Sequence, residues 1–389
     1  GKWIGFAYLH ATIKNKERNH AARALLSPLR LRNNLMVMRD TTVEKVNLVG
    51  TLGGTVTATG VTVTTSNVNC STFSIRASRD IILSAGALNT PLILQRSGVG
   101  RAVDLTPFSI AQKINRPVGL NLHDHPFSLH FFKTNASVAE IQASNDQINI
   151  LVGQAFDYIN YRTGPFTFVG NMMFSGFINT NDATINPDSN PNVQWIFYLF
   201  DYKQLEMSDI LKTKFGISAQ YAQEILNTNQ NYKILMAFNI LLNPVSRGMI
   251  QISGTDPNLP PKIYTNYLSD ANGVDEKALS AGVGKLQQLF STTVMSSISA
   301  SMIKFNITEC NTIAYPSNAY WSCYYKYFMQ NLWHPAGSCM MGKATDPKAV
   351  VDPTLKVLGI SGAPRVRVAD ASIMPQVTSG NTQCPCYLI

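Results

Sequence analysis

Alternating apolar and polar positions dominate residues 34–84 and predict a succession of β-strands. The runs LMVM, TVEKVNLV, TVTATGVTVTT and DIILS are rich in β-branched residues, and Gly and Asn turns separate them. Residues 52–54, Leu-Gly-Gly, lie between two of these runs without a following helix pattern, which predicts the tip of a hairpin. We therefore expect a β-meander in this part of the chain.

The segment GALNTPLILQRSGVG, residues 86–100, predicts a tight turn followed by a helix. An apolar strand pattern precedes it, Gly86 permits the turn, Thr90 is a candidate N-cap, and Pro91 suits a first helical position. Gly98 is a candidate stop. Glycine at the carboxyl end of a strand lets backbone amides approach a nucleotide closely, as in dinucleotide folds. The alternative is a turn that binds no ligand.

Strand and helix patterns are mixed from about Leu122 to Phe328. FTFVGNMMFSGFINT and NVQWIFYLF predict strands, and DEKALSAGVGKLQQLF predicts a helix. The longest apolar run, residues 234–242, is too short to cross a bilayer and contains Asn239, which favours a buried strand or helix. The Phe and Met residues around 166–177, with Trp195 and Phe197, could line an apolar pocket or form ordinary core.

Composition indicates a globular protein. A chain of 389 residues with 45% hydrophobic content can bury a large core in one large domain or two. Charged residues make up only 14%, and Asn, Ser and Thr are abundant, which favours a secreted protein. The net charge is +9, and the first 40 residues hold eight Lys or Arg against two acidic residues, an excess of six. Because no aromatic interleaving accompanies these charges, we expect a solvated face and no nucleic-acid partner.

Cysteines and glycosylation acceptors give two further indications. The Cys384-Pro-Cys386 pair is too tightly spaced for an ordinary zinc site and has no second pair to complete one, so we expect packed thiols and no metal. Three Asn-x-Ser/Thr tripeptides also fit secretion and a glycoprotein, and they begin at Asn69, Asn135 and Asn306.

Three blocks carry a family resemblance. They are NLWHPAGSCMMG with RVRVADASIMPQVTSGNTQCP in residues 331–385, the segment at 86–100, and NPVSRGMIQISGTDPNLPPKIYTNYL at 243–268. The chain resembles the glucose-methanol-choline (GMC) family of FAD-dependent oxidoreductases from about Arg23 to its end, and insect members most closely. The blocks are spread over most of the chain, which makes the resemblance specific.

The resemblance implies a mixed α/β (α+β) fold with two domains. Residues 1–120 and 331–389 would form part of an FAD-binding, Rossmann-like domain, and residues 121–330 an antiparallel-sheet substrate-binding domain. The family's Gly-x-Gly-x-x-Gly turn, which holds a pyrophosphate at a helix N-terminus, has no counterpart in the sequence. We therefore expect a piece that lacks the N-terminal dinucleotide-binding part and stops after a helix starting near Cys384. A separate N-terminal chain or a missing segment would supply that part.

The same resemblance assigns two catalytic residues. Oxidation of an alcohol by hydride transfer to flavin requires removal of the hydroxyl proton, and an imidazole is suited to accept it. His334 matches the position of this base. Asn381 stands where many members carry a second histidine, and its amide would donate to the substrate oxygen. The alternatives are a core histidine and an Asn cap.

Seven residues match FAD-binding positions of the family. They are Val43 near the adenine, Ala85 and Gly86 along the dinucleotide, Asp370 and Ala371 at the pyrophosphate and ribityl chain, and Thr382 and Pro385 near the isoalloxazine ring. For Val43 the alternative is a buried strand valine, and for Asp370 it is a turn-forming aspartate.

Two more features are interpreted through the resemblance. His123-Asp124-His125 suggests metal ligands, but the family has a similar structural turn here, and adjacent strand residues point to opposite faces. We expect a buried, hydrogen-bonded His125. Insect members carry cysteines comparable to Cys310 and Cys323, which implies a disulfide between them.

The expected function is FAD-dependent oxidation of a small-molecule alcohol by a secreted oxidase or dehydrogenase without a membrane span. Two alternatives stay open. One is a hydroxynitrile-lyase-type enzyme in which the flavin is structural, and the other is a non-enzymatic structural, storage or interaction relative.

Overall fold

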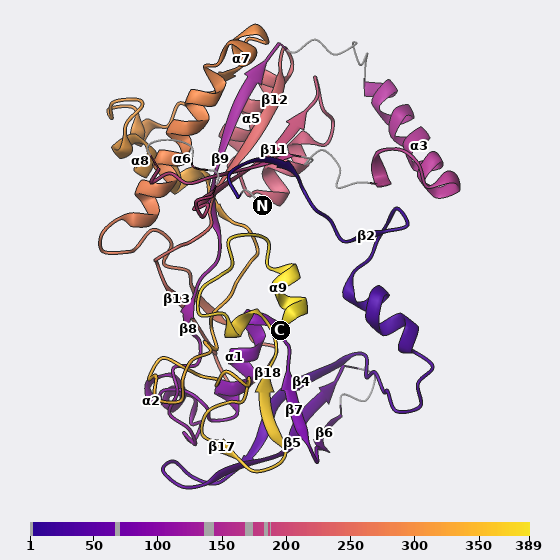
Figure 1. Ribbon diagram of the computed structural model, residues 1–389, viewed down its shortest axis with the longest axis vertical. Helices are drawn as coiled ribbons and strands as arrows, with labels where there is room; N and C mark the ends of the chain where they lie inside the picture. The colour runs from indigo at the N-terminus through magenta and orange to yellow at the C-terminus, as the bar shows by residue number, and fades with distance from the viewer. Residues whose placement is uncertain (1–2, 67–70, 136–143, 168–173, 183–185, 187) are drawn as a thin grey trace. The chain divides into compact units, whose positions relative to one another are not determined.

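The chain forms two compact units in the computed structural model, which describes residues 3–66, 71–135, 144–167, 174–182, 186 and 188–389 (Figure 1). The first unit comprises residues Gly1–Leu35, Pro126–Leu241 and Glu276–Asn331. The second comprises Met36–His125, Leu242–Asp275 and Leu332–Ile389.

Two segments fall outside the expected domain boundaries. Residues 1–35 belong to the first unit because β1 (Gly5–Tyr8) pairs with β10 (Phe174–Ile178). Residues 242–275 belong to the second because β13 (Gly248–Gln251) pairs with β8 (Leu120–Leu122) and β14 (Lys262–Tyr264). Backbone pairing between distant segments decides both placements, and a sequence pattern does not report which strands pair.

An antiparallel seven-stranded sheet organises the first unit. Its order is β1, β10, β11 (Val193–Phe200), β12 (Lys233–Leu241), β9 (Pro126–Thr134) and β15 (Ser301–Met302), with β16 (Met329–Asn331) also paired to β9. The apolar run at 234–242 thus forms a buried central strand, one of its two expected forms. β2 (Ile13–Lys14) and β3 (Glu17–Arg18) form a separate small hairpin.

Helices complete the first unit. They are α3 (Ser144–Tyr161), α4 (Met207–Asp209), α5 (Ala219–Asn229), α6 (Val274–Phe290), α7 (Thr293–Ser297) and α8 (Asn318–Phe328). Helix α6, predicted from its periodicity, packs on the sheet, where Phe290 stacks on Phe132 with ring centroids 3.6 Å apart. Trp195 belongs to this core, and its indole donates to Asn239 Oδ1 at 3.0 Å. Asn239 donates in turn to the carbonyl of Leu279 at 2.9 Å, so the amide in the apolar run is satisfied.

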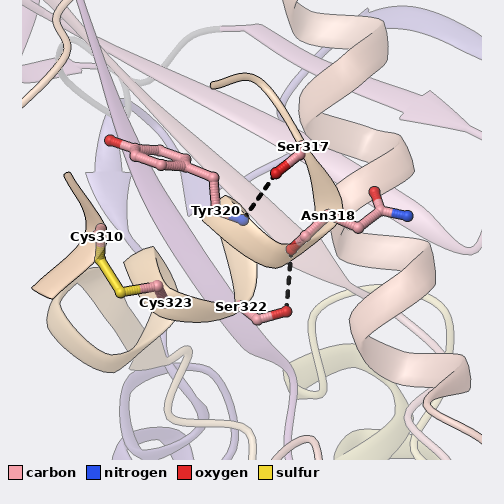
Figure 2. The surroundings of a disulfide bond; sticks show 6 residues. All are labelled: Cys310, Ser317, Asn318, Tyr320, Ser322 and Cys323. Atoms are coloured by element: carbon pink, nitrogen blue, oxygen red, sulfur yellow. Dashed lines mark hydrogen bonds between the residues drawn. A yellow bond between two sulfur atoms is a disulfide. The ribbon is translucent and has the colours of Figure 1, made fainter. Parts of the chain in front are cut away.

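A disulfide joins Cys310 to Cys323 of α8, as the resemblance implies (Figure 2). Helix α8 begins beside it because the Ser317 hydroxyl accepts a hydrogen bond from the amide of Tyr320 at 3.1 Å. The cross-link joins residues 13 apart in sequence and so ties the middle of this helix to the turn at residues 308–310.

The predicted meander forms part of the second unit. β4 (Thr41–Val49), β5 (Val56–Thr65) and β6 (Thr72–Arg76) are antiparallel, and residues 52–54 lie in the turn between the first two. The run at 35–38 is not a strand, contrary to expectation, and its side chains are exposed. The DIIL run forms β7 (Asp80–Leu83) and pairs in parallel with β18 (Arg365–Val368), while β17 (Ile360–Ser361) pairs in parallel with β5.

Helix α1 (Gly86–Arg96) follows β7 and starts four residues before the predicted cap, which places Pro91 inside it. Pro91 has no amide hydrogen for the carbonyl of Ala87, four residues earlier. The buried hydroxyl of Ser338 donates to that carbonyl at 2.6 Å instead. The predicted stop is confirmed, because Gly98 has φ +88° and the amide of Val99 bonds the carbonyl of Leu94 at 3.0 Å.

The remaining α-helices among the described residues of the second unit are short. They are α2 (Ala102–Leu105) and α9 (Gln383–Leu388), the latter close to the helix expected near Cys384. In the part of the chain that the structure describes, no helix combines the length and apolar character that a bilayer crossing requires.

Candidate active site

The two predicted catalytic side chains meet in the second unit. Asn381 Nδ2 lies 3.2 Å from His334 Nε2. The other ring nitrogen of His334, Nδ1, lies 2.9 Å from Nδ1 of His125. His334 is half-buried, His125 is fully buried, and Asn381 is exposed. The imidazole is therefore held from one side by a buried histidine and met from the other by an accessible amide.

Antiparallel pairing of two distant segments brings His125 to His334. His123 and Ala336 exchange backbone hydrogen bonds of 3.1 and 2.8 Å, and the amide of Leu332 donates to the carbonyl of His125 at 3.1 Å. Between these contacts one side advances by two residues (125 to 123) and the other by four (332 to 336), so two extra residues bulge out on the His334 side. A bulge of this kind redirects a side chain away from the regular pleat.

Asp124 holds the bulge in place. Its Oδ1 accepts the amide of His334 at 2.9 Å and the amide of His125 at 2.6 Å. Residue Trp333, directly before the base, adopts a left-handed φ of +55°. A single carboxylate oxygen thus fixes the backbone of both histidines.

Gly337 is required on the other flank of the base. Its φ is +85°, and a Cβ there would lie 2.3 Å from Cε1 of His123 and 2.5 Å from the carbonyl oxygen of Asn121. Only glycine allows this close approach. His123 is buried, and its Nδ1 lies 2.6 Å from the same carbonyl.

Burial keeps the paired histidines neutral. Desolvation lowers the pKa of His334 from 6.5 to about 4. Desolvation, followed by the neighbouring His334, lowers the pKa of His125 to about 3. Both imidazoles are uncharged near neutral pH, and His334 is then in the form that can accept a proton.

The expected burial and hydrogen bonding of His125 are confirmed. Over the described ranges, His, Cys, Asp and Glu side chains form no group of three that could hold a metal ion. The expectation of packed thiols at Cys384 and Cys386 is wrong, because both are exposed on the short helix α9, which has no buried residue. Asn69 lies outside the described residues, whereas Asn135 and Asn306 are exposed.

Asp370 links the loops that follow the parallel strands β7 and β18. Its Oδ2 accepts the amide of Gly86 at 3.0 Å and the hydroxyl of Thr90 at 2.6 Å, and its Oδ1 accepts the amide of Ser372 at 2.8 Å. Thr90 therefore does not cap α1 and instead connects Asp370 to the amide of Ala85 at 3.0 Å. The carboxylate joins residues 284 apart in sequence.

These residues fit a flavin nucleotide at the carboxyl ends of two parallel strands, the usual place for such a ligand. Gly86 has φ +81° with no heavy atom within 4 Å of where a Cβ would stand, which leaves space beside this turn. The Asp370 carboxylate already supplies a negative charge at this helix start, so the place suits hydroxyl donors such as a ribityl chain better than a pyrophosphate.

The other predicted cofactor residues are less distinctive. Val43 is half-buried against the core of the second unit, and Ala371 is buried beside Asp370. Thr382 and Pro385 are partly buried at the start of α9. Their contacts with FAD stay predictions.

Comparison with known proteins identifies the family. The N-terminal and C-terminal profiles described as GMC oxidoreductase match residues 3–127 and 244–389. Over 99% of its length the chain is 34% identical to glucose dehydrogenase [FAD, quinone] of Drosophila pseudoobscura pseudoobscura and 30% identical to ecdysone oxidase of Bombyx mori. It spans 56% and 53% of those relatives, or about half of their length.

A solved structure is similar along the entire chain. An FAD-dependent oxidoreductase from Chaetomium thermophilum superposes with a TM-score of 0.75 at 22% identity, covering 100% of this chain and 66% of that one. This similarity supports the mixed α/β fold with an antiparallel-sheet domain that the sequence predicts, and the match starts earlier in the chain than Arg23. The chain is a member of the GMC oxidoreductase family.

Proposed function

We propose that the protein oxidises a small-molecule alcohol with FAD, using His334 as the general base and Asn381 as the hydrogen-bond donor to the substrate oxygen. The observation that carries this proposal is the contact of 3.2 Å between the Asn381 amide and His334 Nε2. A base and a donor that meet at one point can both address one hydroxyl group. The names of the two insect relatives, both oxidoreductases, support the reaction class.

His334 would accept the hydroxyl proton on Nε2. Its low pKa keeps the ring neutral at neutral pH, so that one of its two nitrogens carries a lone pair. The Asn381 amide would turn from Nε2 to the substrate oxygen and stabilise the negative charge that develops there. General-base catalysis contributes about 10²–10⁴-fold to such a step.

Bound FAD would supply the hydride acceptor. In this chain Gly86 and Asp370 are the residues best arranged to hold it, through an open backbone turn and a buried carboxylate. Val43, Ala85 and Ala371 would contact the nucleotide part, and Thr382 and Pro385 the ring system. FAD binding is a property of the family, and these individual contacts are part of the proposal.

Anaerobic stopped-flow reduction of the purified flavoprotein tests the base. His334→Ala should slow flavin bleaching by an alcohol about 10²–10⁴-fold while substrate affinity changes little. His130→Gln is the matched control, because His130 is equally an imidazole but is buried in the first unit against Tyr324. An unchanged reduction rate in His334→Ala would remove His334 from this role.

The same preparation separates the alternatives. Cyanohydrin cleavage without bleaching would favour the lyase, and a colourless protein would favour the non-enzymatic relative. We also propose that the protein is secreted and glycosylated, supported by the exposed Asn135 and Asn306 and the disulfide. A loss of mass on treatment with an endoglycosidase tests this, and an unchanged mass in material from a secreting host refutes it.

A further inference from the structure

We infer that His125 is a positioning residue that fixes the tautomer of His334, with the proton of His334 on Nδ1 and a lone pair on Nε2. This inference rests on the proposed role of His334 as the base. It gives the His-Asp-His segment, which resembles a purely structural turn, a direct connection to the chemistry.

One shared proton follows from the geometry. The two Nδ1 atoms lie 2.9 Å apart, and the rings are nearly perpendicular, with an interplanar angle of 89°. Burial keeps both rings neutral, so each carries one N–H and one lone pair. A hydrogen bond between the two Nδ1 atoms therefore needs the proton on one of them and a lone pair on the other.

The amide of Asn381 selects between the two arrangements. Its nitrogen lies 3.2 Å from His334 Nε2, and an amide nitrogen can only donate. His334 Nε2 is thus the acceptor, and the ring's own proton must be on Nδ1. His125 Nδ1 then accepts, and the proton of His125 is on its Nε2.

The surroundings of His125 agree with that assignment. Backbone hydrogen bonding by Leu242 and Thr378 raises the pKa of His125 against the larger effect of burial, so acceptors lie close to this ring. Among the described residues His125 Nε2 itself has no hydrogen-bond partner. His125 has no exposed surface, and Asp124 holds its backbone, so the ring offers its Nδ1 lone pair from a fixed position.

The opposite tautomer would disable the base. If His125 donated from Nδ1, His334 would carry its proton on Nε2 and could not accept one from a substrate there. The tautomer of a buried residue that never touches substrate thus decides whether the base is functional.

Nitrogen NMR of the purified protein, with any bound flavin retained, reads the tautomers directly. The chain has six histidines, and ¹⁵N-histidine labelling gives each ring a separate pattern, because protonated and lone-pair nitrogens resonate in different ranges. Comparison with His334→Ala assigns the base. We expect the His334 Nδ1 signal in the protonated range and Nε2 in the lone-pair range. The reverse pattern overturns the inference.

Variants of His125 add a kinetic measurement. His125→Phe removes the acceptor and should lower the flavin-reduction rate about two- to tenfold without changing substrate affinity, the range expected for one neutral hydrogen bond. His125→Asn, whose Oδ1 can reach a similar position, should recover most of that rate. The control is His123→Gln, another buried histidine of the segment, which should leave the His334 tautomer unchanged. Equal rates in wild type and His125→Phe would contradict the inference.

The two proposals fail separately. Absence of flavin reduction by any alcohol in the wild type would refute the proposed function, while the nitrogen shifts would still report the tautomer. Normal reduction together with a proton on His334 Nε2 would refute only the inference about His125.

Discussion

The Ser338 hydroxyl donates to the carbonyl of Ala87, which Pro91 cannot reach with an amide hydrogen because it has none. A double-mutant cycle of Ser338 and Pro91 tests this explanation. Ser338→Ala leaves the carbonyl of Ala87 buried and without its 2.6 Å partner. The unfolding free energy should fall by about 1–3 kcal/mol, the usual cost of an unsatisfied buried polar group. Pro91→Ala restores an amide hydrogen that can reach the same carbonyl within helix α1. In the Pro91→Ala background, Ser338→Ala should therefore lower the unfolding free energy by about 1 kcal/mol less than it does in the wild type.

Urea unfolding followed by tryptophan fluorescence measures the four proteins of the cycle. Ser338→Thr is the matched control, because it keeps the hydroxyl and should lose less than Ser338→Ala. Independent substitutions add to within about 0.3–0.5 kcal/mol. If Ser338→Ala costs the same in both backgrounds within that range, the hydroxyl does not replace the missing amide and our explanation of the proline inside α1 is wrong.

Further predictions concern stability. In the same urea assay, Asp370→Ala should lower the unfolding free energy by about 3 kcal/mol or more, because the carboxylate accepts three hydrogen bonds. Asp370→Asn should lower it less. Replacing both Cys310 and Cys323 by Ser should lower the unfolding free energy by roughly 3 kcal/mol, as expected for a loop of this length. If chemical reduction of the wild-type protein does not lower its stability, the disulfide is absent. Gly337→Ala should cost about 2–5 kcal/mol from steric overlap and left-handed φ, whereas Gly284→Ala in open space should be neutral or stabilising. Burial lowers the pKa of four histidines, which therefore stay neutral in the folded protein and gain protons on unfolding. The urea midpoint of unfolding should fall as the pH drops from about 6.5 toward 4 and stay constant above pH 7. A midpoint that does not change with pH would contradict the burial of these histidines.

Local patterns predicted the elements that depend on local chemistry. The hairpin at 52–54, the helix ending at Gly98 and the long helix α6 follow from turn residues and periodicity. The strands at 56–65 and 72–76 were predicted as a meander and form one. The start of α1 was missed because Thr90, a good N-cap by residue type, bonds Asp370 across 280 residues.

Long-range pairing accounts for what the sequence did not reveal. His334 and Asn381 could be predicted as neighbours because their motifs resemble a known family, but the contact of His125 with His334 spans 209 residues. His125 lies between β8 and β9 and outside any strand, so no strand pattern gave the face on which its side chain lies. The segment that opposes it could not be predicted from the sequence either.

Trp333 shows what the placement of the base requires from the fold. Its left-handed backbone costs a bulky residue roughly 1–2 kcal/mol, and its side chain is 64% exposed, so little packing offsets that cost. Trp333→Gly should relieve this strain and raise the melting temperature. It would also make the backbone next to His334 more flexible, so a gain in stability at this position should lower the rate of the reaction that depends on His334.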